Sequence, residues 1–294
     1  MKTPTVSVIV VNFNAGKLLT ECVHSVLKSV VSVQVLVSDN GSTDGSIQHL
    51  KNTIQDDRLH IHLNHANLGF AKGGNIVLPL ALGEYILFLN PDCLMQSDVL
   101  ERLVCKMKER PDVGMSGCLI LNPDGSEQAG ARRRVPTPWR SVVKVLYLNA
   151  LFPNHPRFQN IILSNEPLPE SSIEVEAISG AFMLVRRTAL EEIGLLDEGY
   201  FLHCEDLDWC MRFRSQGWKV LFVPDVEVVH AKGICSHSRP VRVEWHKHKG
   251  MLRFYGKFFR HQYPMPLMII VIIAVWLRFL GLVMFQCLRR LSLR

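Results

Sequence analysis

Tyr85-Ile86-Leu87-Phe88-Leu89-Asn90-Pro91-Asp92 is a run of five apolar residues that ends in a turn and a carboxylate. An apolar run without polar alternation is typical of a strand that is buried on both faces of a parallel sheet. Further strands are predicted at residues 6–11, 33–37 and 59–63, and helical spacing of apolar residues follows the first two. Strands that alternate with helices indicate an α/β protein with a doubly wound, mostly parallel sheet and flanking helices.

Polar residues follow these strands at or just after the point where each one ends. They are Asn12, Asp39, Asn67 and Asp92. Ligands of open α/β sheets bind beyond the carboxyl ends of the strands. The sequence therefore predicts a binding site at this edge of the sheet.

A second acidic cluster, Glu205-Asp206-Leu207-Asp208-Trp209, precedes a helical pattern at residues 207–216. Together with Asp39 and Asp92, these carboxylates could hold a nucleotide and a metal ion and could deprotonate a hydroxyl group. The alternative is an acidic first helical turn that the helix dipole favours, which would explain one or two of them. In a helix Asp206 and Asp208 point to different sides, whereas in an extended turn they share a side, so both remain candidates.

The net charge of +6 is concentrated near the C-terminal end. Residues 239–261 contain Arg239, Arg242, Lys247, Lys249, Arg253, Lys257 and Arg260. A basic stretch beside an apolar one is typical of a segment that lies against anionic lipid. A nucleic-acid partner is not expected, because no nucleic-acid-binding motif accompanies these charges.

The eight cysteines form no Cys-x-x-Cys pair, and a chain of 294 residues needs no disulfide framework. The chain begins with Met1-Lys2-Thr3-Pro4 and enters a strand directly, without the pattern of a signal peptide. We therefore expect reduced thiols and a cytoplasmic location.

The segment from Met265 to Cys287 is apolar apart from Arg278 and Gln286. Its uninterrupted part, residues 265–277, would reach about 20 Å as a helix, less than the roughly 30 Å of a bilayer core. A longer helix would place Arg278 in hydrocarbon at a cost of roughly 2.5–3.5 kcal/mol. We expect a membrane-associated helix that is interfacial or re-entrant, and the alternative is a buried helix of the soluble domain.

Seven motifs in this order resemble the family 2 glycosyltransferases and their GT-A fold. They are residues 6–14, Asp39-Asn40-Gly41-Ser42-Thr43-Asp44-Gly45, residues 67–75, Leu89-Asn90-Pro91-Asp92, Ser179-Gly180-Ala181-Phe182, Glu205-Asp206-Leu207-Asp208 and His230. The resemblance covers about residues 5–235 and is greatest to bacterial rhamnosyltransferase-type members that build cell-surface polysaccharides. Many GT-A enzymes carry Asp-x-Asp where this chain has Asn90-Pro91-Asp92, which puts its metal affinity in question.

The resemblance implies roles for individual residues. The metal ligands for Mg²⁺ or Mn²⁺ would be Asp92 and His230. The nucleotide and donor sugar would be bound by Asn12, Asn14, Asp39, Asn67, Gly69, Asn75 and Gly180. The general base would be Asp206, with Asp208 as the second candidate. The acceptor would contact Glu205 and Trp209, although Trp209 fits core packing equally well.

The implied activity is inverting transfer of a sugar from a dTDP- or UDP-sugar, with L-rhamnose favoured, to a lipid-linked glycan. It would take place at the inner face of the cell membrane. Residues 1–235 would form the catalytic domain, with a nucleotide-binding half at 1–120 and an acceptor-binding half at 121–235. Residues 236–294 would form the membrane-association segment.

The alternative function is a catalytically weak protein that binds nucleotide or glycan on the same fold. A nucleotidyltransferase or a dehydrogenase would carry a glycine-rich phosphate loop after the first strand. This chain has Asn12-Phe13-Asn14-Ala15-Gly16-Lys17 there.

Overall fold

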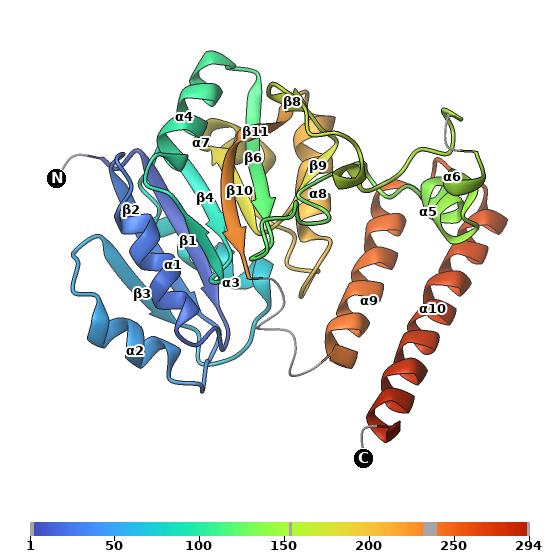
Figure 1. Cartoon of the computed structure of the whole chain (residues 1–294), viewed down its shortest axis with the longest axis horizontal. Helices are drawn as coiled ribbons and strands as arrows, with labels where there is room; N and C mark the ends of the chain where they lie inside the picture. The colour runs from blue at the N-terminus through green and yellow to red at the C-terminus, as the bar shows by residue number, and fades with distance from the viewer. Residues whose placement is uncertain (1–2, 153–154, 232–239, 293–294) are drawn as a thin grey trace.

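A twisted nine-stranded sheet forms the centre of the molecule in the computed structural model, which describes residues 3–152, 155–231 and 240–292 (Figure 1). The strand order is β3-β2-β1-β4-β10-β6-β11-β5, with β8 beside β11. The strands are β1 (Val6–Asn12), β2 (Val33–Asp39), β3 (Leu59–Leu63), β4 (Tyr85–Leu89), β5 (Cys93–Met95), β6 (Val113–Leu121), β8 (Ile173–Glu174), β10 (Phe182–Arg186) and β11 (Lys219–His230). Two short strands, β7 (Arg132–Arg133) and β9 (Ala177–Ile178), pair separately.

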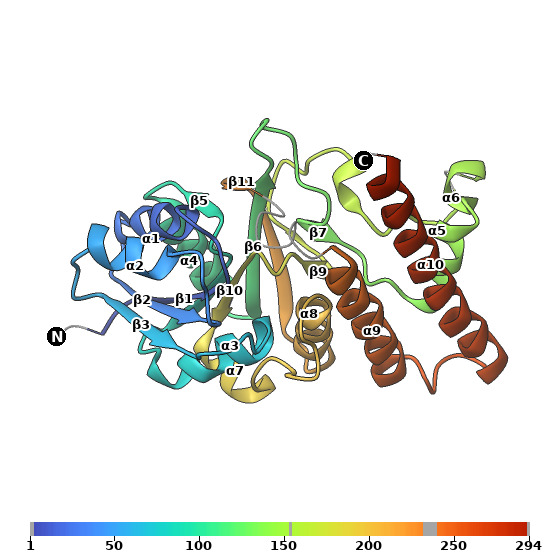
Figure 2. The same ribbon diagram turned by 90° about the horizontal axis from the view of Figure 1, so that it is seen from below.

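Helices cover both faces of this sheet (Figure 2). They are α1 (Leu18–Leu27), α2 (Ser46–Thr53), α3 (Phe70–Val77), α4 (Val99–Glu109), α5 (Pro138–Val145), α6 (Leu148–Leu151), α7 (Arg187–Ile193), α8 (Glu205–Ser215), α9 (Pro240–Phe258) and α10 (Met265–Ser292), with 3-10 turns η1 (Leu78–Leu80) and η2 (Leu163–Asn165). Alternate residues of β1 face opposite cores, because side chains alternate along a strand. Ile9 packs with α3, α7 and α8, whereas Val8 packs with α1, α2 and α4.

The strands β3, β2, β1 and β4 are parallel, and their carboxyl ends meet at one edge. The predicted α/β fold with a mainly parallel sheet is therefore confirmed. The short strands β5 and β8 pair antiparallel with β11 at the far edge, and β10 runs antiparallel within the sheet, between β4 and β6. Its start consequently lies at the carboxyl end of β4, where the Asn90 N–H donates to the Ala181 carbonyl at 3.0 Å.

Several predicted boundaries differ from those of the structure. The helix predicted from Leu207 begins at Glu205, and the two strands predicted at 219–223 and 226–230 form the single strand β11 with a register shift after Val223. The proline-rich excursion at 122–172 contains β7, α5, α6 and η2. The strand β6 was not predicted.

The helices α9 and α10 lie side by side as a hairpin in both views (Figures 1 and 2). Trp245 of α9 packs on Trp276 and Phe279 of α10, with ring centroids 5.1 and 5.6 Å apart. The apolar 22-residue segment of α10 from Met265 to Gln286 is long enough to cross a membrane, but only 11% of it is buried. It is therefore not a buried core helix, the alternative that the sequence left open. The predicted boundary at residues 235–236 and Arg239 lie outside the described residues.

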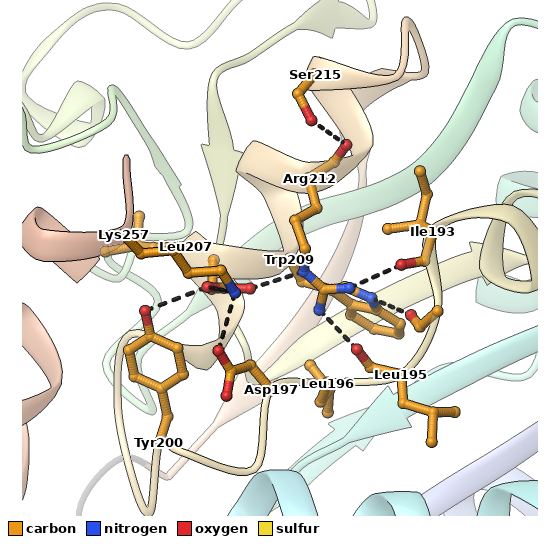
Figure 3. Close-up of polar contacts among 12 residues, drawn as sticks. Ile193, Leu195, Leu196, Asp197, Tyr200, Leu207, Trp209, Arg212, Ser215 and Lys257 are labelled. Atoms are coloured by element: carbon orange, nitrogen blue, oxygen red, sulfur yellow. Dashed lines mark hydrogen bonds and ion pairs between the residues drawn. The ribbon is translucent and has the colours of Figure 1, made fainter. Parts of the chain in front are cut away.

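Asp208 is fully buried, and it joins α8 to α9 through a cluster of ion pairs. Figure 3 shows Lys257 of α9, Tyr200 and Arg212 converging on this point. The Lys257 Nζ lies 2.6 Å from an oxygen of Asp208. The Arg212 Nε and the Tyr200 hydroxyl also donate to Asp208, at 2.8 and 3.2 Å. Lys257 and Arg253 also donate to Asp197, and although burial opposes them, these hydrogen bonds lower the pKa of Asp197 to about 2.

We expect the Lys257→Met substitution to destabilise the protein by about 2 kcal/mol, because it removes a charged hydrogen-bond donor from a buried carboxylate. The measurement is the free energy of urea unfolding in mild detergent. Lys249→Met, an exposed lysine of the same helix, is the matched control. Equal losses in the two variants would contradict the structural role of the cluster.

Candidate active site

The carboxyl ends of β1 and β2 carry a network of hydrogen bonds centred on Asp39. The Asn12 side-chain amide donates to Asp39 at 2.8 Å, and the Ser42 hydroxyl donates to the same oxygen at 2.6 Å. The Asn14 backbone N–H donates to Ser42, and its side-chain oxygen accepts from Thr43. The turn-forming role and a nucleotide-binding role of Asp39 are compatible, because the network fixes the turn at the edge where ligands of this sheet type bind.

The next loop, after β3, is held against the segment that precedes α8. Asn67 accepts from the Gly69 N–H at 3.1 Å, and the Phe70 N–H donates to the Phe201 carbonyl at 2.9 Å. Gly69 has φ of +85°, and a Cβ there would lie 2.4 Å from the Phe201 oxygen. Asn75 is buried and exchanges hydrogen bonds with the backbone of Leu196. In this structure the loop is therefore packed closely against the segment before α8, and the donor-binding role of its residues stays a prediction.

Asp92 and His230 lie together at the ends of β4 and β11. Their side chains are 5% and 6% exposed, and the His230 Nε2 lies 3.0 Å from an Asp92 oxygen. Gln128 donates through its amide to Asn122, so its oxygen accepts from the His230 Nδ1–H at 2.7 Å. This bond leaves the Nε2 as an acceptor, which lies 3.3 Å from the Asn90 amide nitrogen and 3.0 Å from an Asp92 oxygen. A cation between the Nε2 and the Asp92 carboxylate would compensate their facing lone pairs.

The geometry of this pair fits a hard divalent cation. Bonds of about 2.1 Å at a right angle place two octahedral ligands about 3 Å apart, which matches the separation of Asp92 from His230. Cys93 lies within reach, but its thiol donates to the Ala181 carbonyl, and burial raises its pKa well above the ordinary value. It therefore stays a neutral thiol and is a poor ligand for such an ion.

Asp206 stands in the first turn of α8, where three donors converge on its carboxylate. The Arg133 guanidinium of β7 contacts one oxygen, and the Gly180 N–H donates to the same oxygen at 2.9 Å. The Leu207 N–H donates to the other oxygen. The backbone between Gly180 and Ala181 thus connects Asp206 with Asn90, two residues before Asp92. The start of β10 therefore links two acidic segments that are far apart in the sequence.

Glu205 lies beside Asp206 and is almost fully buried, at 6% exposure. Its Oε2 has no hydrogen-bond partner among the described residues, and the Arg133 Nε is unpartnered in the same way. Burial, and then the charge of Asp206, raise the pKa of Glu205 to about 8. At neutral pH Glu205 is therefore mostly protonated and lies beside the Arg133–Asp206 ion pair.

The structure separates two predicted residues from this group. Asp208 lies in the helix and points to Lys257, so the extended turn that would put it beside Asp206 is absent from this part of the chain. Trp209 is fully buried, packs edge-on against Phe88 and Phe213, and donates from its indole to the Gly194 carbonyl. Of the alternatives left open for Trp209, the structure shows core packing.

Two residues of the site, Arg133 and Gln128, were missed by the sequence analysis. Arg133 lies in Arg132-Arg133-Arg134 of a proline-rich segment, and this charge run was its only signal. Gln128 has no distinguishing pattern around it. Only the folded chain brings them to Asp206 and His230.

Comparison with known proteins identifies the family. The family model described as "Glycosyl transferase family 2" matches residues 7–194. The chain belongs to this family. An N-acetylglucosaminyl-diphospho-decaprenol L-rhamnosyltransferase of Mycobacterium tuberculosis is 31% identical over 249 residues, which cover 80% of this chain and 78% of the relative. The dTDP-rhamnosyl transferase RfbF of Shigella flexneri is 25% identical over 70% of this chain and 63% of its own length.

Solved structures share the fold. The mannosyltransferase PcManGT of Pyrobaculum calidifontis, in complex with GDP-Man and Mn²⁺, has a TM-score of 0.60 at 19% identity and covers 93% of this chain and 69% of its own. The S. aureus protein TarS, in complex with UDP, has a TM-score of 0.55 at 17% identity and covers 85% of this chain and 65% of its own. The predicted GT-A fold and the predicted family are confirmed. Neither comparison favours the alternative of a catalytically weak binding protein.

We expect the Glu205→Gln substitution to stabilise the protein by a few degrees in Tm at pH 8.5 and to change little at pH 4. A raised pKa means that the stability of the protonated form is fully present below about pH 4.3 and is lost as pH rises through about 8. The measurement is Tm against pH.

Glu101→Gln, an exposed glutamate of α4, is the control for this series. A difference between E205Q and the wild type that is the same at every pH would show that Glu205 is not held protonated by the fold.

Proposed function

We propose that this protein transfers L-rhamnose, with inversion, from a nucleoside-diphosphate donor such as dTDP-rhamnose to a lipid-linked glycan on the inner face of the cell membrane. The observation that carries this proposal is that the Gly180–Ala181 backbone links Asp206 to Asn90, which stands two residues before Asp92 of the Asp92–His230 pair. A single displacement needs the base and the group that holds the leaving diphosphate on the same side of the fold, around one sugar. The two rhamnosyltransferase relatives support the choice of sugar and of acceptor class.

The Asp92–His230 pair would hold Mg²⁺ or Mn²⁺, which supplies charge neutralisation to the departing diphosphate. Asp92 would contribute the single carboxylate, and Gln128 fixes the His230 ring so that its Nε2, which also lies near the Asn90 amide, faces Asp92. Asp39 and Asn12, with Asn14 beside them, would bind the nucleoside at the ends of β1 and β2. Asn67, Gly69, Asn75 and Gly180 would act by shaping the backbone around the donor.

Asp206 would act as the general base that takes the proton of the acceptor hydroxyl. Its two oxygens accept from backbone N–H groups, which fix their direction. Arg133 stabilises the ionised form, and Glu205, with its free Oε2, would accept a hydrogen bond from the acceptor. Asp208 would help to position Asp206, because its contact with Lys257 links α8 to α9.

Two apolar surfaces support membrane association. One is the exposed side of α10, and the other is the α5–α6 surface, in which Val145, Leu146, Tyr147, Leu151 and Phe152 are each more than half exposed. Burial, and then the nearby charges of Arg278 and Lys247, lower the pKa of Lys144. A cationic cluster between apolar surfaces fits the headgroup region of an anionic bilayer.

The hairpin geometry supports an interfacial helix rather than a spanning one. α9 packs along α10 and carries Arg242, Lys247, Lys249, Arg253 and Lys257. A spanning α10 that kept this contact would take these charges into hydrocarbon at roughly 2.5–3.5 kcal/mol each. An in-plane hairpin leaves them at the interface.

We expect purified protein to release nucleoside diphosphate from dTDP-rhamnose when Mg²⁺ or Mn²⁺ and a diphosphate-lipid-linked N-acetylglucosamine are present. A chelator should abolish the release. Asp206→Asn should lower kcat by about 10²- to 10⁴-fold in protein that remains folded by circular dichroism, because it removes the base. Asp92→Asn should raise the metal concentration required for half-maximal rate.

Asp57→Asn, an exposed aspartate outside the site, is the matched control for both variants. A panel of UDP-sugars run in parallel tests the donor. Near-normal transfer by D206N would refute the assignment of the base, and turnover with a UDP-hexose alone would refute the choice of rhamnose.

We expect the Leu146→Glu/Tyr147→Glu variant to bind anionic vesicles about tenfold more weakly than the wild type, because two apolar side chains no longer enter the bilayer. The measurement is flotation of the full chain at low and high salt. Leu82→Glu, an exposed leucine far from α10 in the sequence, is the control. Unchanged binding of the double variant would exclude the α5–α6 surface from the membrane contact.

A further inference from the structure

A cavity of about 420 Å³ lies outside the site described above. Its walls come from the start of α5, the segment after α6, the residue before β9, the C-terminal half of α8 and the loop after α9. The residues used below are Trp139, Arg140, Arg157, Glu176, Arg214 and Phe259. None of them was predicted as a site residue.

The cavity carries an excess of positive charge. Arg140 makes a two-pronged ion pair with Glu176, with contacts of 2.5 and 2.9 Å, so these two charges cancel. Arg157 and Arg214 take part in no ion pair among the described residues. Two uncompensated guanidinium groups facing one hollow favour a ligand with more than one negative charge.

One side of the cavity continues into the apolar α5–α6 surface. Trp139 packs on Phe158 with centroids 6.2 Å apart, and Phe158 packs on Phe152 at 5.8 Å. Trp139 is anchored by its indole N–H, which donates to the Arg157 carbonyl. An aromatic path therefore leads from the two arginines to exposed Leu151 and Phe152. A ligand with an anionic group and a long apolar chain would match both parts.

The opposite side of the cavity leads toward Asp206. The Val135 N–H donates to Glu176 at 2.7 Å, and Val135 lies two residues along the chain after Arg133. Arg133 contacts Asp206 directly. Three contacts, from Glu176 through Val135 and Arg133, therefore connect the cavity wall with Asp206.

We propose that this cavity binds the diphosphate of a prenyl-diphosphate-linked acceptor, with Arg157 and Arg214 as the phosphate contacts. The prenyl chain leaves over the Trp139–Phe158–Phe152 path into the bilayer, and the sugar attached to the diphosphate points at Asp206. This inference rests on the proposed function, because it assigns a subsite to that acceptor. It would also explain why a charged pocket adjoins the apolar surface.

The test is binding of farnesyl diphosphate to the full-length protein, compared with farnesol, inorganic pyrophosphate and UDP. Arg157→Gln and Arg214→Gln are each expected to weaken farnesyl diphosphate binding about tenfold, since each removes a charge-assisted hydrogen bond. Both side chains are exposed, so the variants should fold normally. Lys108→Gln, an exposed lysine of α4, is the control, and UDP binding should be unchanged in all variants.

Equal affinity for farnesyl diphosphate in the wild type and both variants would overturn the proposal. So would wild-type affinity for pyrophosphate equal to that for farnesyl diphosphate, because the site would then read a free anion and not a lipid carrier.

The kinetic counterpart is the KM for a diphosphate-linked acceptor against that for the same sugar on a phosphate-free apolar aglycone. The variants should raise only the first by about tenfold. If no donor supports transfer while farnesyl diphosphate binding still depends on the two arginines, the proposed function fails and the subsite stands. If transfer occurs and both KM values are unaffected, the subsite fails and the function stands.

Discussion

The antiparallel insertion of β10 between β4 and β6 is the constraint on which the rest of the structure depends. It turns the Gly180–Ala181 backbone toward the carboxyl end of β4, where Ala181 accepts from Asn90. The adjacent Gly180 N–H is then free to fix Asp206, and a Cβ at Gly180 would lie only 3.3 Å from that side chain. One short strand thus brings the acidic residue of each half of the chain to a shared edge.

Burial gives the neighbouring carboxyl groups of Glu205 and Asp206 different roles. Ionising two adjacent buried carboxyl groups costs free energy, so one keeps its proton and the other pairs with the guanidinium of Arg133. Arg133 decides which, because it contacts Asp206 and leaves Glu205 unpaired. The Glu205 Oε2 and the Arg133 Nε have no hydrogen-bond partners among the described residues, which costs free energy. A ligand rich in hydroxyl groups would supply partners for both atoms.

The sequence was sufficient to predict the strands that lead to Asp39 and Asp92, because β4 is a continuous apolar run and β2 is rich in valine. It could not predict β6, whose glycines leave room for Phe213 and Ile178 of distant elements. The role of Asp208 depends on Lys257, forty-nine residues later, and no local pattern encodes such a contact. Arg133 escaped notice because it is placed by a pair of two-residue strands inside a segment that resembles a loop.

The Lys257–Asp208 contact has a consequence for the choice of acceptor. It links the hairpin of α9 and α10 to the helix that carries Asp206, so Asp206 keeps a constant distance from α10. On the proposed placement of the hairpin in the lipid interface, only sugars at that height would reach the proposed base. The distance between the hairpin and Asp206 would then select a lipid carrier early in glycan assembly over the same sugar at the end of a longer glycan.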